Sequence, residues 1–440
     1  MHPLSSPTPS SGVPDSGGNA PPGLWRDADF RRLWAGQTAS QLGEHTTLVV
    51  LPLFAVLTLD AGAGQLGVLL AVGQAPILLL SLLAGAWVDR WRARTVMVLT
   101  DAARSVALGA AAVAGIFGLL GLPALFVVAF TVGALSVLFD VAYQASLVRM
   151  VRRDQLVQGN SALEGSRSAA QIGGPALGGA LVSLLSAPVA AAAGALFFAV
   201  SFVSLRRIRR PEAAPECVAP VTERPERAAP VRRRILEGVR FIATNACLRA
   251  VCLASAAFQF SLAATMTVYL LFLPRELHLT GVTVGLVLAA TGPGALLGSV
   301  LAARLPGRFG HGVVLVSAAV LGNGALLCVP ALHGSSAATV LALLAANLVF
   351  GTFSQLVNVT VMAVRQAATP DGMQGRAAAT ITFVGMGFTP LGSLLGGLLA
   401  QEWGLRTGLL VAAAGMMLSP VLMAASPLAR LGRVLPAPQT

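Results

Sequence analysis

The 440-residue chain contains no lysine, since all 30 of its basic residues are arginine. A Walker A loop needs its lysine on the nucleotide phosphates, so the chain is not itself a P-loop ATPase. A Schiff base to retinal or pyridoxal is excluded as well, because the lysine amine is the nucleophile in that chemistry. Two classes of lysine-dependent protein are thereby ruled out.

Charge of either sign is also scarce. Only 11% of the residues are charged and 55% are hydrophobic, whereas soluble domains are about 25% charged. Such a chain cannot present a polar surface to water on all sides. The net charge of +12 could indicate a nucleic acid partner, but the arginines lie in short breaks between apolar runs. We therefore expect no nucleic acid partner.

Metal-ligating and catalytic side chains are few and scattered. The chain has four cysteines and five histidines, and their spacing matches neither a metal site nor a catalytic constellation. Buried thiols of small volume are the ordinary explanation of such cysteines. We expect no enzyme, no metal and no organic cofactor.

What the sequence does contain is a series of long apolar segments. About 20 apolar residues suffice to cross a hydrocarbon core of about 30 Å. The sequence predicts twelve such spans, and hence an all-α membrane protein embedded in a lipid bilayer. They cover residues 33–59, 64–88, 95–119, 122–148, 160–185, 188–206, 247–273, 281–304, 311–332, 335–364, 377–400 and 405–428.

The placement of arginine predicts the orientation. With the N-terminus inside, only Arg275 and Arg406 fall in loops on the outer side. Positive residues are enriched in cytoplasmic loops, so we expect a multi-pass protein of the plasma (inner) membrane with both termini in the cytoplasm.

A polar stretch divides the spans into two groups of six. We expect a disordered cytoplasmic tail at 1–23, a six-helix bundle at 24–206, a cytoplasmic linker at 207–246, a second bundle at 247–430 and a tail at 431–440. The last part of the linker has the pattern of an amphipathic helix lying on the inner leaflet.

The two halves repeat. Val148-Arg149 and Gln158-Gly159 recur as Val364-Arg365 and Gln374-Gly375, each shifted by 216 residues. Both copies precede a span rich in glycine with an internal proline. Two similar bundles around a central path are typical of secondary transporters built from parallel repeats.

Several segments carry a family resemblance. The loop Gly85-Ala-Trp-Val-Asp-Arg-Trp-Arg-Ala-Arg94 resembles the loop between the second and third helices of the major facilitator superfamily. The entry Trp25-Arg-Asp-Ala-Asp-Phe-Arg31 and the segments Ser40–Glu44, Phe139–Gln144 and Glu164–Ser168 resemble the macrolide and siderophore exporter branch of that superfamily. The resemblance implies twelve helices in two six-helix bundles and transport by alternating access.

Ionisable groups within the spans are the first functional candidates, because charge in a membrane is costly. Glu44, in the first span, is the candidate for a proton site or for a contact to substrate charge. Its alternative role is a fixed ion-pair partner. Asp140, Glu164 and Arg167 form a second candidate group. Glu164 and Arg167, like Asp101 and Arg104, are spaced i, i+3 and can pair on one helix face.

Uncharged polar and aromatic residues and glycines supply further candidates. Polar side chains within spans either contact substrate or hold helices together. The glycines and prolines of the fifth and eleventh spans predict close helix contact and a hinge. The candidates for cavity lining are Gln41, Tyr143, Gln171, Gln259, Gln355 and Asn358. The hinge and packing candidates are Gly174, Pro175, Gly178, Gly179, Pro390 and Gly392.

The resemblance also implies a cytoplasmic gate made of Gly85, Asp89, Arg90 and Arg94. In that family pattern Asp89 meets the start of the eleventh span, where the helix dipole favours an anion. The simpler explanation of the arginines is a positive-inside topology signal.

We therefore expect a proton-coupled exporter of a hydrophobic or amphipathic small molecule, monomeric and driven by a proton gradient. A siderophore or other metabolite exporter is the alternative within transport. A membrane sensor or assembly factor that does not transport is the alternative from another class.

Overall fold

The structure is a computed structural model that describes residues 24–88, 92–150, 155–209, 231–370 and 373–433. Every regular element in these ranges is a helix, as the sequence predicts. The N-terminal group contains α1 (Ala28–Leu57), α2 (Ala63–Val88), α3 (Ala93–Ile116), α4 (Leu122–Met150), α5 (Leu156–Leu184) and α6 (Ala187–Arg206). A linker helix, α7 (Val231–Thr244), follows. The C-terminal group contains α8 (Ala246–Arg275), α9 (Gly281–Ala289), α10 (Thr291–Ala302), α11 (Leu305–Phe309), α12 (His311–Leu327), α13 (Ala337–Ala368), α14 (Gln374–Gly387), α15 (Thr389–Gly415) and α16 (Leu418–Ala424).

Short polar residues begin several of these helices. Asp27 accepts a hydrogen bond from the backbone N–H of Asp29 at the start of α1, and Asn245 accepts from Cys247 and Leu248 at the start of α8. Thr280 and Ser336 do the same for α9 and α13. Such caps satisfy N–H groups that have no partner within the helix.

Ten helical segments in the described residues are long and apolar enough to cross a membrane. One of them, Thr380–Ala424, covers the last two predicted spans, and the chain turns within it at Gly404, whose φ is 78°. Helix α5 is 29 residues long, although it does not belong to the ten. Its glycine, serine and glutamine residues lower its hydropathy. The helices are thus consistent with twelve crossings.

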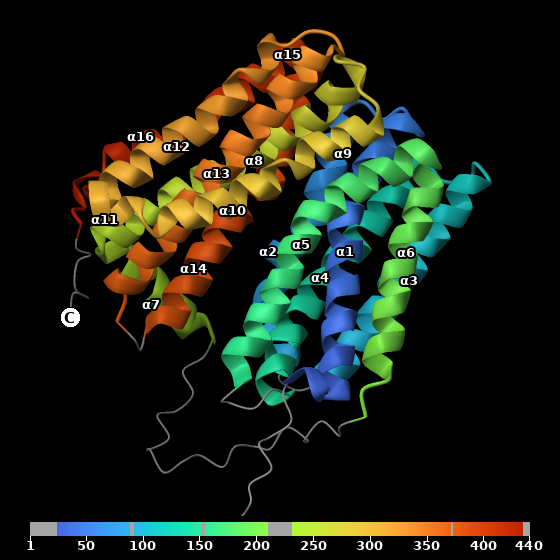
Figure 1. Cartoon of the computed structure of the whole chain (residues 1–440), viewed down its shortest axis with the longest axis horizontal. Coiled ribbons are helices and arrows are strands. Elements are labelled where there is room, and N and C mark those ends of the chain that lie inside the picture. The colour runs from blue at the N-terminus through green and yellow to red at the C-terminus, as the bar shows by residue number, and fades with distance from the viewer. Residues whose placement is uncertain (1–23, 89–91, 151–154, 210–230, 371–372, 434–440) are drawn as a thin grey trace, which may run out of the picture.

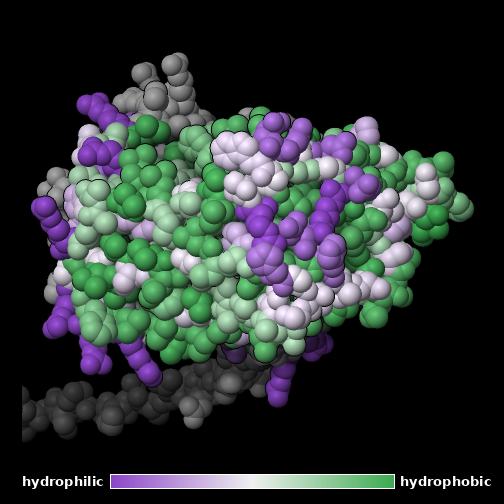
Figure 2. Space-filling view, turned by 90° about the horizontal axis from the view of Figure 1, so that it is seen from above, coloured by the Kyte–Doolittle hydropathy of each residue, from purple (hydrophilic) through white to green (hydrophobic). Residues whose placement is uncertain are grey.

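The outer surface is apolar. Val106, Phe117, Leu119, Val127 and Leu184 are each at least 66% exposed. Figure 2 shows hydrophobic side chains over most of the face viewed, with hydrophilic ones in a patch near its middle and along its rim. Hydrocarbon chains, rather than water, are the matching solvent for such a surface.

The two groups of helices lie close together at one end and diverge toward the other (Figure 1). At the first end α5 packs on α9 and α2 packs on α15. We call this the closed end, defined by Asp60, Ser183, Arg275 and Gly281. The opposite end, defined by Leu24, Arg206 and Thr244, is called the linker end.

The predicted linker helix is present as α7. It packs against α14 and α8, and its Ile242 is buried in an apolar cluster of the C-terminal group. Val239, by contrast, is exposed. The helix therefore uses part of its apolar face to dock on the protein, and its place on the inner leaflet stays a prediction. The predicted domain boundaries stay a prediction.

Candidate functional site

A cavity of about 800 Å³ lies between the two groups of helices. Helices α8, α10, α12, α13, α14 and α16 form most of its wall, while α1 and α5 contribute from the N-terminal group. Its volume lies within the range of roughly 300–1,000 Å³ that is typical of small-molecule sites. The cavity can therefore hold a ligand of drug size.

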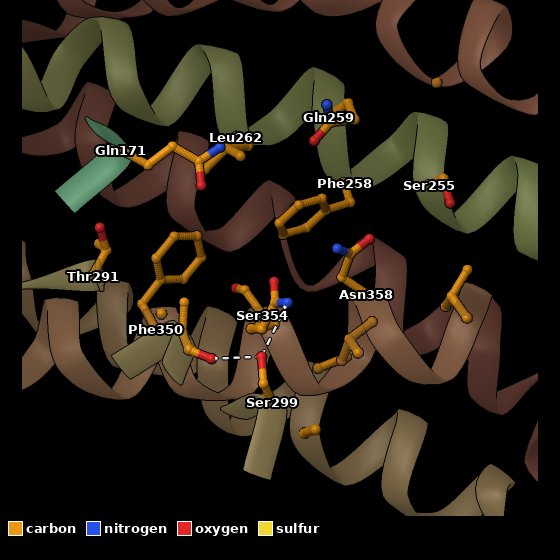
Figure 3. Close-up of a pocket in the computed structure, with 18 of the residues that line it drawn as sticks. Gln171, Ser255, Phe258, Gln259, Leu262, Thr291, Ser299, Phe350, Ser354 and Asn358 are labelled. Carbon is orange, nitrogen blue, oxygen red and sulfur yellow. Dashed lines mark hydrogen bonds between the residues drawn. The ribbon is translucent and has the colours of Figure 1, made fainter. Parts of the chain in front are cut away.

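Amides, hydroxyls and two phenyl rings point into this cavity (Figure 3). Gln171 of α5 and Phe258 of α8 project from one side, and Phe350 and Asn358 of α13 project from the other. Ser299 of α10 accepts a hydrogen bond of 3.3 Å from the amide of Gln355. A wall that combines apolar surface with many polar groups can hold a ligand and orient it.

Four of the six residues predicted to line a cavity do so: Gln171, Gln259, Gln355 and Asn358. Gln41 is buried within α1, and Tyr143 is half-buried near Phe30 and Phe139. Neither belongs to the described lining of this cavity. These two side chains pack inside the N-terminal group instead.

Among the described residues, the ionisable groups that line the cavity all come from the N-terminal side. Its ionisable lining residues are His45 of α1 and Glu164 and Arg167 of α5. The i, i+3 spacing predicts a pair between Glu164 and Arg167, but no ion pair joins them in the described part of the chain. Both side chains are exposed, and water competes for such groups, so the spacing alone does not hold them together.

A second, smaller hollow of about 200 Å³ lies among α1, α2 and α4. Glu44 and Asp140, both predicted as charge candidates, line it together with Gln74 and Ser136. His45, next to Glu44 in α1, lines the larger cavity instead. Adjacent residues of a helix face different directions, so α1 presents one ionisable group to each space.

Arg104 of α3 lies behind the smaller hollow and is fully buried. It forms an ion pair with Asp101, and its guanidinium donates to the hydroxyls of Ser40 and Ser136, each at 3.1 Å. Its Nη1 lies 3.8 Å from the carboxylate of Glu44. The i, i+3 pair of Asp101 and Arg104 is therefore present, as the spacing predicts.

Two phenyl rings complete the surroundings of Arg104. The guanidinium carbon lies 4.6 Å from the ring centre of Phe139 and 4.5 Å from that of Phe198. Asp101 in turn accepts hydrogen bonds from Ser40 and Ser201. Sequence reasoning missed this enclosure, because the serines and rings come from α1, α4 and α6 and no local spacing connects them.

The predicted cytoplasmic gate is only partly visible. Gly85 lies in α2, whereas Asp89 and Arg90 lie outside the described residues. Arg94 donates hydrogen bonds to the backbone carbonyls of Leu205 (3.2 Å) and Arg206 (2.8 Å) at the end of α6. A cation at a helix C-terminus is favourable, so Arg94 ties α3 to α6. The gate itself stays a prediction.

The predicted glycines pack closely on neighbouring helices. A methyl group at Gly174 would lie 2.5 Å from Cβ of His45, and one at Gly178 would lie 2.9 Å from the carbonyl oxygen of Thr46. Added methyl groups at Gly179 and Gly392 would overlap the carbonyl oxygens of Gly281 and Phe260. Small residues permit such backbone approach in membranes.

The two prolines lie where the helices can bend. Pro175 is inside α5, and Pro390 stands in the first turn of α15, directly after the end of α14 at Gly387. Pro175 removes a hydrogen bond inside α5, whereas the first turn of α15 needs no N–H partner at Pro390. A hinge motion there stays a prediction.

Comparison with known proteins decides the family. Residues 20–436 match the family described as transmembrane secretion effector, which is part of the major facilitator superfamily. The chain belongs to this family. It is a multi-pass membrane transporter that moves a small-molecule substrate, as the sequence predicts, and the proteins that it resembles are transporters rather than enzymes.

The transporter has relatives among efflux pumps. It is 27% identical over 399 residues to the multidrug efflux pump Tap of Mycobacterium tuberculosis, a match that covers 84% of this chain and 87% of the pump. The Tap protein of Mycobacterium bovis matches equally well.

Solved structures show the same fold. A bacterial homologue of the iron transporter ferroportin, in an inward-facing state, has a TM-score of 0.73 with 18% identity and covers 91% of this chain and 98% of that one. A mutant of the nucleoside transporter NupG has a TM-score of 0.72 with 12% identity. The match covers 90% of this chain and 99% of that one. At these identities the likeness concerns the fold alone.

Proposed function

We propose that this transporter is a proton-coupled exporter of hydrophobic or amphipathic small molecules, working as a monomer in the plasma membrane with both termini in the cytoplasm. The observation that carries the proposal is the cavity of about 800 Å³ between the two halves. Transport by alternating access needs a central site of this kind, which each side of the membrane reaches in turn.

The wall of the cavity supports a large, weakly polar substrate. Phe258 and Phe350 offer apolar surface, while Gln171, Gln259 and Asn358 offer both donors and acceptors. Amide groups orient a ligand without requiring that it carry charge. The sequence likeness to Tap, a multidrug efflux pump, agrees with a substrate of this class.

Glu44 is the leading coupling group. Its carboxylate lines the smaller hollow, and its atom Oε2 is buried without a hydrogen-bond partner. A carboxylate held away from water is costly unless it is neutralised. Binding and release of a proton at Glu44 would thus be linked to the conformation of the protein around it.

The test is uptake into inverted membrane vesicles that contain the transporter. A radiolabelled macrolide is added outside vesicles that have acidified their interior, with and without a protonophore. We expect uptake that the protonophore collapses. Glu44→Gln should lose this gradient-dependent uptake, because the amide keeps the shape of the side chain but cannot exchange a proton.

Glu402→Gln is the matched control, since Glu402 is an exposed residue of α15. It should transport like the unaltered protein. Gradient-dependent uptake that survives Glu44→Gln would refute the role of Glu44. Uptake that the protonophore leaves unchanged would refute proton coupling altogether.

A further inference from the structure

Four arginines lie at the linker end of the C-terminal group, beside α11 and α12. Arg304 and Arg308 lie directly before and within α11, in the connection between α10 and α12. Arg430 and Arg433 follow the last helical segment that is long enough to cross a membrane. All four are exposed. We call these four residues the arginine patch. In Figure 1, α11, α12 and α16 lie together at the outer edge of the C-terminal group.

Backbone hydrogen bonds bring the two halves of the patch together. The N–H of His311 donates to the carbonyl of Gly432, and the N–H of Gly312 donates to that of Leu431, each at 3.0 Å. The segment after α16 is thereby fixed against the start of α12, which places its two arginines next to α11. The same bonds occupy the first two N–H groups of α12. The attraction of this place for an anion therefore comes from the arginine side chains.

The positive charge of the arginine patch has no counter-charge in the described part of the protein. No ion pair or side-chain hydrogen bond joins any of the four side chains to another described residue. The sequence contains no aspartate or glutamate between Glu276 and Asp371, and none after Glu402. Helices α10, α11, α12 and α16 therefore carry no acidic residue. Arginines without counter-charge at a surface attract anions from outside the protein.

Exposed apolar side chains adjoin the patch. Phe309 of α11 is exposed, and the guanidinium carbon of Arg308 lies 5.3 Å from the centre of its ring. Val300 near the end of α10 and Val313 in the first turn of α12 are exposed as well. Both helices belong to segments that are long and apolar enough to cross a membrane. The patch therefore lies at a boundary between hydrocarbon and headgroups, where arginine places its apolar stem in one and its charge in the other.

From these observations we infer that the arginine patch binds the headgroup of an anionic phospholipid, whose acyl chains lie against the apolar surface of α10 and α12. Guanidinium groups present paired N–H donors that match the oxygens of a phosphate. Basic pockets beside membrane helices recognise anionic headgroups in this way. A zwitterionic headgroup carries its own cation and gains less from the patch. None of the four arginines lines the larger cavity, so the site goes beyond the proposed function.

The test measures lipid binding to the purified full-length protein in detergent by native mass spectrometry. Dioleoylphosphatidylglycerol, which is anionic, is compared with dioleoylphosphatidylcholine, which has the same acyl chains and a zwitterionic headgroup. We expect the first molecule of the anionic lipid to bind at least about tenfold more tightly. Soluble glycerophosphoglycerol, which is the headgroup without acyl chains, should not displace the lipid at equal concentration, because apolar contact is part of the site.

Two double variants test the charge. Arg308→Gln with Arg430→Gln removes one arginine from each half of the patch. Binding of the anionic lipid should weaken about tenfold, since one arginine near a membrane surface contributes up to about fivefold in affinity. Arg26→Gln with Arg207→Gln is the matched control, because both are exposed arginines of the N-terminal group at the same end. It removes the same charge and should leave lipid binding unchanged.

A glycine variant tests the arrangement of the patch without changing its charge. A methyl group at Gly312 would lie 2.4 Å from the carbonyl oxygen of Ala429, so in Gly312→Ala the segment after α16 must move away from α12. We expect binding of the anionic lipid to weaken at least about threefold, because two arginines leave their place. Gly324→Ala, in the same helix, meets nothing within 4 Å and should bind lipid like the unaltered protein.

Three results would overturn the inference: equal binding of the two lipids, equal effects of the two double arginine variants, or equal binding by the two glycine variants. The first would mean that the patch does not select an anionic headgroup. The other two would mean that the lipid follows the net charge of the protein rather than this arrangement of arginines. Thermal unfolding in detergent checks that each variant is folded. If Gly312→Ala does not fold, the surface arginine variants still decide the question.

Discussion

The guanidinium of Arg275, at the end of α8, lies 2.7 Å from the carboxylate of Asp60, in the connection between α1 and α2. The same Nη2 atom donates to the backbone carbonyl of Ala61 at 2.9 Å. The pair joins the two halves at the closed end. At the same end the backbone N–H of Val282 donates to the hydroxyl of Ser183 at 2.8 Å.

Loss of the pair between Arg275 and Asp60 should increase the fraction of molecules in which the closed end is open. The side chain of Asp60 is 97% exposed and that of Arg275 is 33% exposed, so the effect is expected to be less than about tenfold. Arg275→Gln should act more strongly than Asp60→Asn, because Arg275 also holds Ala61. The measurement is labelling of Gln171→Cys, in a background without the native cysteines, by an impermeant thiol reagent added at the closed end.

Glu276→Gln is the control for this experiment. Glu276 pairs with Arg406 within the C-terminal half at the same end, so its loss should leave the labelling rate unchanged. If all three variants accelerate labelling equally, the pair between the halves has no special part in closure.

The contact between α5 and α9 gives a second prediction. A methyl group at Gly179 would lie 2.7 Å from Cα of Gly285 and overlap the carbonyl oxygen of Gly281, whereas one at Gly173 meets nothing within 4 Å. Gly179→Ala should therefore destabilise the closed arrangement by about 1–3 kcal/mol. Gly173→Ala, the same change six residues earlier, should be neutral or slightly stabilising. Thermal unfolding in detergent compares them, and equal unfolding temperatures would contradict the prediction.

Hydropathy and residue type predicted the helical spans and several site residues, because the membrane restricts which residues a span can contain. Helical spans must be apolar and about 20 residues long, which places α1 to α6 near their predicted positions. Adjacent residues on a helix diverge, so the separation of Glu44 from His45 also follows from the sequence. The packing role of the glycines of α5 was also predictable, because close approach of two helix backbones in a membrane requires small residues.

Pairing between side chains was not predictable in the same way. Asp101 with Arg104 and Glu164 with Arg167 share one spacing, yet only the first pair forms. The difference lies in the surroundings: Ser40, Ser201 and two phenyl rings enclose the first pair, while the second is exposed to a cavity. These partners come from distant parts of the chain. The contact of Asp60 with Arg275 likewise joins residues 215 positions apart.

The amides of the larger cavity should affect substrate affinity. Gln259→Leu and Asn358→Leu each remove a polar group that lines the cavity. A hydrogen bond contributes about 1 kcal/mol, so we expect the KM for export to rise by about three- to tenfold. Gln366→Leu is the control, because Gln366 is an exposed residue of α13 outside the described cavity lining. Vesicle uptake at varied substrate concentration measures KM, and an equal rise in the control would argue against direct contact.

The enclosure of Arg104 should make it the most sensitive charged residue described. Arg104→Met leaves Asp101 buried without its cation, and breaking a buried pair costs about 3–5 kcal/mol. Arg104→Lys should also be harmful, because an ammonium group cannot reproduce the planar guanidinium between the rings of Phe139 and Phe198. Thermal unfolding of the purified variants measures both effects.

Removal of both charges of the pair between Asp101 and Arg104 should destabilise the protein less than removal of Arg104 alone. In Asp101→Leu with Arg104→Met no uncompensated charge remains, and apolar residues often replace a buried pair at little loss of stability. We therefore expect the double variant to unfold at a higher temperature than Arg104→Met alone. If the double variant is the less stable of the two, the hydrogen bonds that Asp101 accepts from Ser40 and Ser201 matter more than charge balance. Vesicle uptake by a stable double variant would then separate two roles of Arg104. If Arg104 acts on Glu44, the double variant should lose gradient-dependent uptake. If Arg104 only supports the fold, that uptake should persist.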